Sequence, residues 1–168
     1  GIGSEKIYAA TWGDYLQCYT FSEQVWNLSG PSEGIENAYL NSVYASEGLL
    51  LAGGMGDNYY WTARIFSSTD GNAWQSRWQG PSGQSIDVPA LLKLSNGSWL
   101  TGLRVYKKIH IMSSTDQGQS WTIVMDIPVS LYGSVNSFLE LSSSEILAGT
   151  DYGIYQSVDS GLSWNLFG

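Results

Sequence analysis

The chain has 168 residues, and its 15 Asp and Glu outnumber its 7 Lys and Arg, giving a formal net charge of −8. This acidic balance without a basic stripe argues against nucleic-acid binding, and the chain lacks the run of about 18 apolar residues that would indicate a membrane span. One cysteine, Cys18, and one histidine, His110, exclude a disulfide framework and multi-histidine metal sites, so we expect neither a metal nor a cofactor.

Short runs of β-branched and aromatic residues, bounded by Gly, Ser and Asn, predict strands along the whole chain. The first three are Lys6–Thr11, Tyr15–Thr20 and Val25–Ser29. Three later sets of four strands begin near Glu36, Ile86 and Ser134. In the middle set the strands are Pro89–Leu94, Trp99–Arg104, Ile109–Ser113 and Trp121–Asp126, and Asn96-Gly97 forms a hairpin turn between the first two.

A short motif, which we call the box, recurs along the chain as S-x-D-x-G-x-S-W. It is complete at 114–121 and 157–164, one residue shorter at 68–74, and degraded at 21–26, where Trp26 closes it. The residues expected to build the three better boxes are Ser68, Asp70, Gly71, Trp74, Ser114, Asp116, Gly118, Trp121, Ser157, Asp159, Gly161 and Trp164. A second short motif, which we call the marker, recurs with the same period at 7–10, 50–53, 99–102 and 146–149.

Each residue type in the box suits a structural role. The Asp accepts hydrogen bonds from N–H groups of its own turn, and the Gly takes a positive φ at no steric cost. The Trp buries a large apolar area, and we expect all four tryptophans to pack between neighbouring units. The box therefore predicts a turn between the third and fourth strands of a repeated sheet.

The repeats run approximately over 1–31, 32–81, 82–129 and 130–168 and predict one all-β domain, a β-propeller of about four blades of four antiparallel strands. The first blade lacks its innermost strand. Three explanations stay open: the chain is an excerpt of a longer propeller, several copies complete a larger ring, or a small four-bladed ring tolerates one three-stranded blade.

The boxes resemble those of the Asp-box (bacterial neuraminidase repeat) β-propellers, a group that includes sialidases and xyloglucan-degrading glycosidases. The resemblance implies an extracytoplasmic or secreted location, although the chain itself shows no signal peptide. Sialidases of this group hold their substrate with three arginines, and this chain has only Arg64, Arg77 and Arg104. Arg77 falls in an outer strand, so the resemblance does not extend to sialidase activity.

In a propeller, the loops between second and third strands share one face, away from the boxes. Every blade places an aromatic residue there, and three blades add an Asp. The candidate ligand-binding residues are Trp12, Asp14, Tyr15, Asp57, Tyr59, Tyr60, Trp61, Arg104, Tyr106, Asp151 and Tyr152. Flat aromatics beside carboxylates suit sugars, while the alternative is that these rings only pack on each other.

Asp87 is the single weak candidate for a catalytic residue, because it begins an inner strand. A glycosidase needs two carboxyl groups, and Asp57 or Glu36 would have to supply the second. The alternative is that Asp87 caps a loop or is solvated. We expect a non-catalytic binding or scaffold module for a carbohydrate or a protein surface, with additional copies or blades as further partners. The alternatives are part of a glycoside hydrolase or polysaccharide lyase, and a structural or assembly propeller.

Overall fold

The computed structural model describes residues 6–11, 16–29, 35, 38–46, 48–56, 62–81 and 85–168, and every regular element within them is a strand. The strands are β1 (Lys6–Ala10), β2 (Leu16–Thr20), β3 (Val25–Ser29), β4 (Tyr39–Ser46), β5 (Leu49–Met55), β6 (Ala63–Ser68), β7 (Gln75–Gln79), β8 (Ser85–Lys93), β9 (Trp99–Ser114), β10 (Thr122–Gly133), β11 (Val135–Glu140), β12 (Ile146–Thr150), β13 (Gly153–Ser157) and β14 (Asn165–Leu166). In this described part of the chain, no helix is long and apolar enough to cross a membrane.

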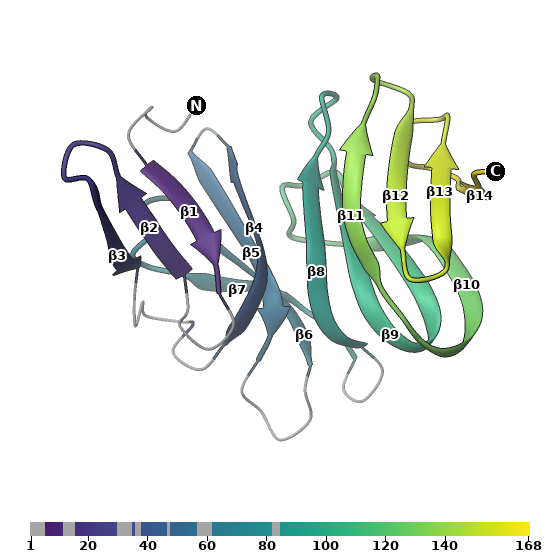
Figure 1. Ribbon diagram of the computed structural model, residues 1–168, viewed down its shortest axis with the longest axis horizontal. Helices are drawn as coiled ribbons and strands as arrows, with labels where there is room; N and C mark the ends of the chain where they lie inside the picture. Colours follow the sequence, from purple (N-terminus) through teal and green to yellow (C-terminus); the bar gives the residue numbers. More distant parts are fainter. Residues whose placement is uncertain are drawn as a thin grey trace.

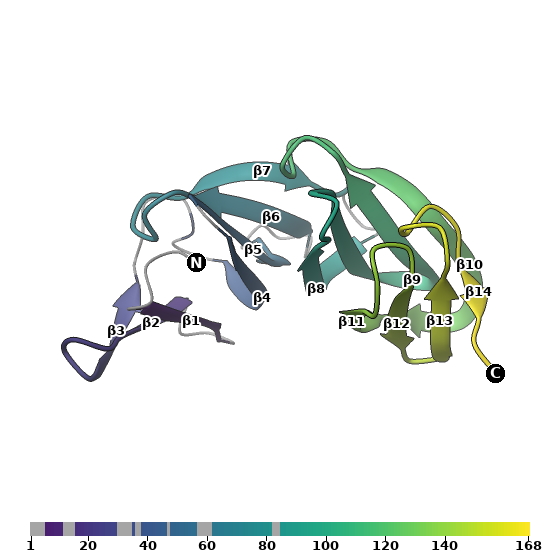
Figure 2. The same ribbon diagram turned by 90° about the horizontal axis from the view of Figure 1, so that it is seen from above.

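The strands form four antiparallel sheets in sequence order, as predicted (Figure 1). We call them blade one (β1–β3), blade two (β4–β7), blade three (β8–β10) and blade four (β11–β14). Seen from above, the blades follow one another along an arc, with blades one and four at its two ends (Figure 2). The chain therefore forms a section of a propeller, and the closed four-bladed ring considered from the sequence is not formed.

Blade one contains three strands within the described residues, and the missing one is the innermost. The marker residues Ile7 and Tyr8 lie in β1, at the position that Leu50 and Leu51 occupy in β5, the second strand of blade two. β1 pairs with β2 from Lys6↔Thr20 to Ala10↔Leu16, as β5 pairs with β6. The prediction for the first blade is confirmed.

Blade three differs from the prediction, because the expected second and third strands are joined in β9. The first part of β9 pairs with β8, from Lys93↔Trp99 to Ser85↔Val105, and the second part pairs with β10. Lys107 has a φ of 60°, outside the extended region, and marks the bend where the ribbon turns back (Figure 1). The connection is so tight that the backbone on both sides of the bend remains paired with the neighbouring strands β8 and β10.

The three better boxes close through the same hydrogen bonds. In the box at 114–121, Ser114 Oγ donates to Asp116 Oδ1 at 2.8 Å, and Gly118 N donates to Ser114 Oγ at 2.9 Å. Asp116 Oδ1 also accepts from the N–H groups of Gln119 (3.0 Å) and Ser120 (2.9 Å). The corresponding bonds recur at 157–164 and, one residue shorter, at 68–74.

Each of these boxes aims its tryptophan at the preceding blade. Trp74 Nε1 donates to Gly71 O at 3.2 Å, and Trp121 and Trp164 make the same bond within their boxes at 3.1 Å. Trp74 packs with residues of blades one and two, Trp121 against a cluster from blades two and three, and Trp164 within a cluster from blades three and four. The interfaces between blades are the hydrophobic core of the molecule.

The degraded box of blade one does not pin its tryptophan. Its turn at residues 21–24 closes through Gln24 N and Thr20 O at 2.8 Å, and Gln24 has a φ of 55°. Trp26 lies in β3, beside the Tyr19 ring at 5.3 Å between centroids, and stays half exposed. The expectation that Trp26 packs between blades is wrong for this chain, because none of the described blades covers it.

The marker glycines allow the inner strand of the next blade to approach closely. A Cβ at Gly102 would come within 3.0 Å of the Val135 side chain of blade four, and Gly53 has the same relation to Val88 of blade three. Gly149, at the same position in blade four, would meet only Ser137 Oγ, at 2.8 Å. Ser137 belongs to the same blade, so among the described residues nothing from another blade covers Gly149.

The box carboxylates predict a specific acid sensitivity. Hydrogen bonds from the Ser120 hydroxyl and N–H hold the pKa of Asp116 at about 2, below its ordinary value of 3.8, and Ser163 does the same for Asp159. A carboxyl group with a lowered pKa in the folded state stabilises the fold above its unfolded pKa, and this contribution is lost as the pH falls.

We therefore expect the unfolding temperature of the protein to fall between about pH 4 and pH 2. The double variant Asp116→Asn/Asp159→Asn should be less stable at neutral pH and decline less steeply over this window, as followed by circular dichroism. Equal slopes for both proteins would contradict the assignment of the acid sensitivity to the boxes.

A matched pair of glycine substitutions tests the packing of blade on blade. Gly102→Ala should destabilise the fold by about 1–3 kcal/mol, because its Cβ overpacks against Val135. Gly149→Ala should be neutral or slightly stabilising, since Ser137 can rotate away and alanine restricts the unfolded chain. Urea unfolding of the two variants gives the comparison, and a similar loss in both would disprove the argument.

Candidate functional site

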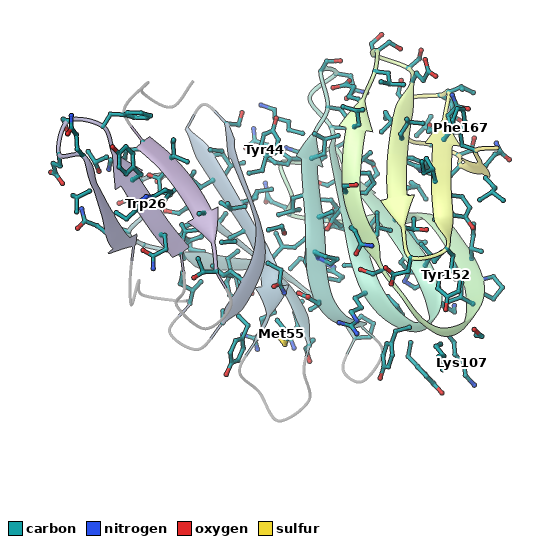
Figure 3. The ribbon with its side chains drawn as sticks, viewed as in Figure 1. Trp26, Tyr44, Met55, Lys107, Tyr152 and Phe167 are labelled. Atoms are coloured by element: carbon teal, nitrogen blue, oxygen red, sulfur yellow. The ribbon has the colours of Figure 1, made fainter. Side chains whose placement is uncertain are left out.

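The turns between second and third strands lie on one side of the arc. Lys107, at the bend of β9, and Tyr152, between β12 and β13, lie on the lower side in Figure 3, as does Met55 at the end of β5. Four candidate ligand residues belong to the described chain: Arg104, Tyr106, Asp151 and Tyr152. The remaining candidates lie outside the described residues, namely Trp12, Asp14, Tyr15, Asp57, Tyr59, Tyr60 and Trp61.

Two exposed tyrosines, Tyr106 and Tyr132, lie together on the described part of this side, and we call them the tyrosine platform. Their ring centroids lie 5.1 Å apart with the planes tilted by 55°. The Arg104 guanidinium lies 5.6 Å from the centre of the Tyr132 ring, and the Lys107 ammonium 5.2 Å from that of Tyr106. A cation next to each ring holds the pair in place and leaves much of both rings open to solvent.

Tyr132 was missed among the candidate residues of the sequence. It pairs with Tyr106 in the ladder between β10 and β9, after a register shift between Pro128 and Tyr132. We expected β10 to end at Asp126, but it continues to Gly133 and follows the bend of β9. Tyr132 stands directly before an inner strand, which places it in a connection between two blades on the same face as the candidate ligand residues. Its position in the sequence was therefore sufficient to predict it as a further candidate.

Asp151 and Tyr152 form a tight turn in blade four. Asn136 Nδ2 donates to Asp151 Oδ1 at 2.7 Å, and the Asp151 N–H donates to Ser134 O at 3.1 Å. Tyr152 N donates to Thr150 Oγ1 at 3.1 Å, and the Tyr152 ring is exposed. The turn is thus built by its own polar groups, with one aromatic ring presented to solvent.

Asp87 is buried, so the alternative in which it is solvated is wrong. Asn41 Nδ2, from the inner strand of blade two, donates to Asp87 Oδ2 at 2.5 Å, and Val88 N donates to Asp87 Oδ1 at 2.7 Å. Burial raises the pKa of Asp87, while the bonds from Asn41 and Val88 and the charge of Arg104 act in the opposite direction. Asp87 pairs with Arg104 in the ladder between β8 and β9, so this carboxyl group adjoins the tyrosine platform.

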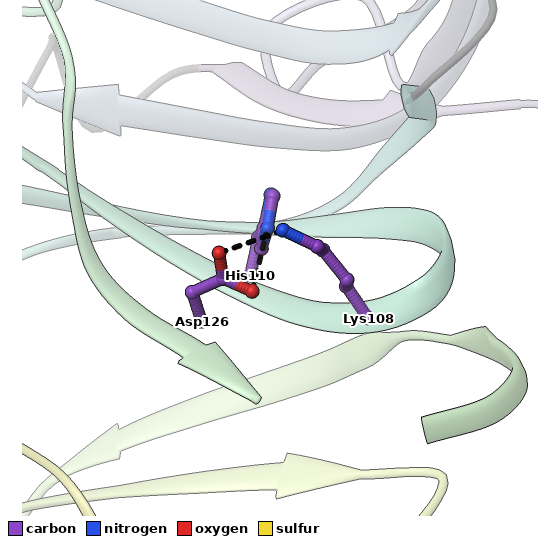
Figure 4. A network of polar contacts seen from close by, with 3 residues as sticks. All are labelled: Lys108, His110 and Asp126. Atoms are coloured by element: carbon purple, nitrogen blue, oxygen red, sulfur yellow. Dashed lines mark hydrogen bonds and ion pairs between the residues drawn. The ribbon is translucent and has the colours of Figure 1, made fainter. Parts of the chain in front are cut away.

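A second polar cluster joins β9 to β10 (Figure 4). Lys108 Nζ lies 2.8 Å from Asp126 Oδ2, and His110 Nε2 lies 3.2 Å from Asp126 Oδ1. Burial lowers the pKa of His110, while the nearby Asp126 carboxylate acts in the opposite direction. Across the described residues, no three His, Cys, Asp or Glu side chains gather where a metal ion would bind.

A hollow of about 350 Å³ lies on the opposite side of the arc, between blades two and three. Residues of the box turns and of the turns after β4 and β8 line it, together with Arg77 and Lys93. Both cations already donate to serines, Arg77 Nε to Ser67 Oγ at 2.8 Å and Lys93 Nζ to Ser46 Oγ at 2.7 Å. The hollow shares no residue with the tyrosine platform.

No family model matches the chain, and no curated protein matches it in sequence. Among solved structures it is similar to an ancestral GH74 enzyme (14% identity, TM-score 0.74, 96% of this chain and 22% of that one). It is also similar to the extracellular domain of a one component system of B. thetaiotaomicron (12%, TM-score 0.71, 97% and 21%) and to a protein of unknown function from Dyadobacter fermentans (19%, TM-score 0.61, 90% and 57%).

These similarities establish the fold of the chain, an all-β section of a propeller. The chain spans about a fifth of the length of the first two of these proteins.

The environment of Asp87 predicts an unusual titration. Its carboxyl group should titrate above the ordinary aspartate value of about 3.9, because burial outweighs its hydrogen bonds. Asn41→Ala should raise the pKa further, since the amide stabilises the ionised form. Carboxyl ¹³C NMR measures both, with Asp126, whose pKa is lowered by Lys108, as the internal control. A value for Asp87 at or below that of Asp126 would refute this account.

Proposed function

We propose that this chain is a non-catalytic, carbohydrate-binding section of an Asp-box β-propeller. The observation that carries the proposal is the tyrosine platform, an exposed pair of rings in tilted contact, beside two cations and next to a buried carboxyl group. Loops held by a rigid scaffold are a common location for binding residues, and this platform stands at the bend of β9.

The chemistry of the platform matches a sugar. An aromatic ring covers the apolar C–H face of a pyranose, and neighbouring polar groups direct the hydroxyls. Arg104 and Lys107 supply donors at either end of the tyrosine pair, and a guanidinium also accepts a sugar carboxylate in two parallel hydrogen bonds. Neutral sugars and uronic acids are therefore both suitable ligands.

Two further observations support the proposal. The hydrogen-bonded boxes have the residue pattern of the Asp-box propellers, and the GH74 enzyme similar in fold acts in carbohydrate chemistry. A second similar structure is an extracellular domain, which supports an extracytoplasmic location for this chain as well. A carbohydrate ligand is the simplest role consistent with the platform and with both comparisons.

A glycosidase section is the second candidate, favoured by the raised pKa of buried Asp87. A general acid of a glycosidase needs such a pKa, but it also needs a second carboxyl group several ångströms away. The two partners nominated from the sequence, Asp57 and Glu36, lie outside the described residues. A purely structural or assembly propeller, binding a protein surface, is the third possibility.

Isothermal titration against a panel of neutral and acidic oligosaccharides tests the proposal. Tyr132→Ala and Tyr106→Ala should each weaken binding about tenfold, because a buried aromatic face contributes about 1.5 kcal/mol or more. Phe167→Ala is the matched control, an exposed aromatic residue near the C-terminus. Binding that both tyrosine variants retain in full, or no binding across the panel, would refute the proposal.

The same panel separates the alternatives. Release of reducing ends that Asp87→Asn abolishes would identify a glycosidase, while a fixed protein stoichiometry without any response to sugars would favour the scaffold.

A further inference from the structure

All three interfaces between blades are built alike. We call the side of a blade that faces the next blade in the chain its trailing face, and the side that faces the preceding blade its leading face. The trailing face carries the second marker residue. The leading face carries the first marker residue and the box. A Cβ at Gly118 would lie 3.2 Å from Leu51 of the preceding blade, and one at Gly161 would lie 3.2 Å from Leu100. Gly71 stands in the same relation to Tyr8, the equivalent residue of blade one.

In the described part of the chain, no blade lies against the leading face of blade one. Its aromatic and aliphatic residues include Ile7, Tyr19, Phe21 and Trp26. Ile7 pairs with Tyr19 and Tyr19 with Trp26, so these three project from the same side of the sheet. Tyr19 packs edge to face with Phe21 at 5.2 Å. Trp26 is 50% exposed, whereas the equivalent Trp74 of blade two is 4% exposed.

The trailing face of blade four is equally uncovered. Its apolar residues include Leu139, Leu147 and Ile154, which the ladders of β11, β12 and β13 place on one side of the sheet. Ile154 is 46% exposed, whereas the equivalent Ile111 of blade three is fully buried. Gly149 lies on this same face, without the valine that covers Gly53 and Gly102.

The two uncovered faces are the two halves of one more interface of the same kind. One offers a leucine and an isoleucine, as the trailing faces of blades two and three do with Leu51, Ile65, Leu100 and Ile111. The other offers the tryptophan and aromatic residues of a leading face. Each end of the arc in Figure 2 carries one half. The named residues on both faces carry no charge, and covering them removes apolar area from water. Gln156 pairs with Leu147 and so shares the trailing face, where it donates to Glu145 Oε1 at 2.7 Å.

We propose that a second copy of this chain covers both faces, with the trailing face of blade four of each protomer docked on the leading face of blade one of its partner. This head-to-tail contact is heterologous, and with two protomers it closes a ring. The chain has four blades, so two copies present twice that number, which lies within the usual range of propellers. In such a ring, the described strands β1–β3 of one protomer include no inner strand to lie beside Gly149 of its partner.

Sedimentation equilibrium of the 168-residue chain tests the proposal directly. The expected mass is twice the 18.4 kDa of the chain. Raising the salt concentration should strengthen the dimer, because two chains of net charge −8 repel each other and salt screens that repulsion. A monomer at every soluble concentration, or a mass of three or more chains, would overturn the two-copy ring.

Charge substitutions then establish the head-to-tail geometry. Trp26→Asp and Ile154→Asp should each give monomers, because every interface in either homodimer would contain one altered face. Mixing the two variants should restore a 1:1 complex, since the wild-type trailing face of one meets the wild-type leading face of the other. Leu162→Asp, at a 70% exposed position of the box turn, should remain dimeric.

Two outcomes would contradict this geometry. If only one of the two variants is monomeric, the protomers meet through a symmetric contact of a single face. If the mixture stays monomeric while circular dichroism shows that both variants are folded and unfold cooperatively, the two faces do not bind each other. Both altered positions are exposed within the protomer, so the variants should fold, and the mass of the unaltered chain tests the proposal even if one does not.

Discussion

The rest of the structure depends on one constraint: each sheet of this chain has two apolar faces, and each face must be covered by another blade. A single four-stranded sheet with both faces exposed would leave residues such as Leu51, Ile65 and Phe66 in water, and in the structure all three are fully buried. Burial of each such side chain contributes about 1.5–3 kcal/mol, so stacking of blades, and not pairing of strands within one, supplies most of the stabilisation. The arc is the direct result of stacking twisted sheets in this way.

The boxes make this stacking specific. The Asp accepts hydrogen bonds from N–H groups of the turn that have no partner in the sheet. The Gly takes a φ above 80°, so that the turn can lie flat against the previous blade. The Trp is then anchored by its own indole N–H to the Gly carbonyl. Blade one shows the contrast, because without the Asp and the Gly its turn closes differently and Trp26 lies along a strand.

Much of the fold could be predicted from the sequence because its determinants are local and repeated. The box residues lie within eight positions of each other, and their spacing set the blade order and revealed the missing inner strand. The continuity of β9 could not be predicted, since it depends on the bend at Lys107 being tight enough to keep both halves in the ladder. The bond between Asn41 and Asp87 was also out of reach, because 46 positions separate these residues and nothing local links them.

The candidate site was predicted only in part for the same reason. Arg104 and Tyr106 follow from the topology of one hairpin, whereas Tyr132 joins them only because β10 extends around the bend. The aromatic residues of blades one and two that were predicted on this face, such as Trp12 and Trp61, lie outside the described residues, so their part in the site stays a prediction.

The separation between the tyrosine platform and the uncovered faces has a functional consequence. Tyr106, Tyr132, Arg104 and Asp87 all belong to blade three, and the packing partner of Asp87 comes from blade two. The geometry of the platform is therefore complete within one protomer and does not require the ring to close. Closure would instead bring a second platform into the same assembly, and two linked sites raise the apparent affinity for a long polymer through effective concentration, without any new contact. A repeated ligand such as a polysaccharide would gain from this arrangement, and a monosaccharide would not.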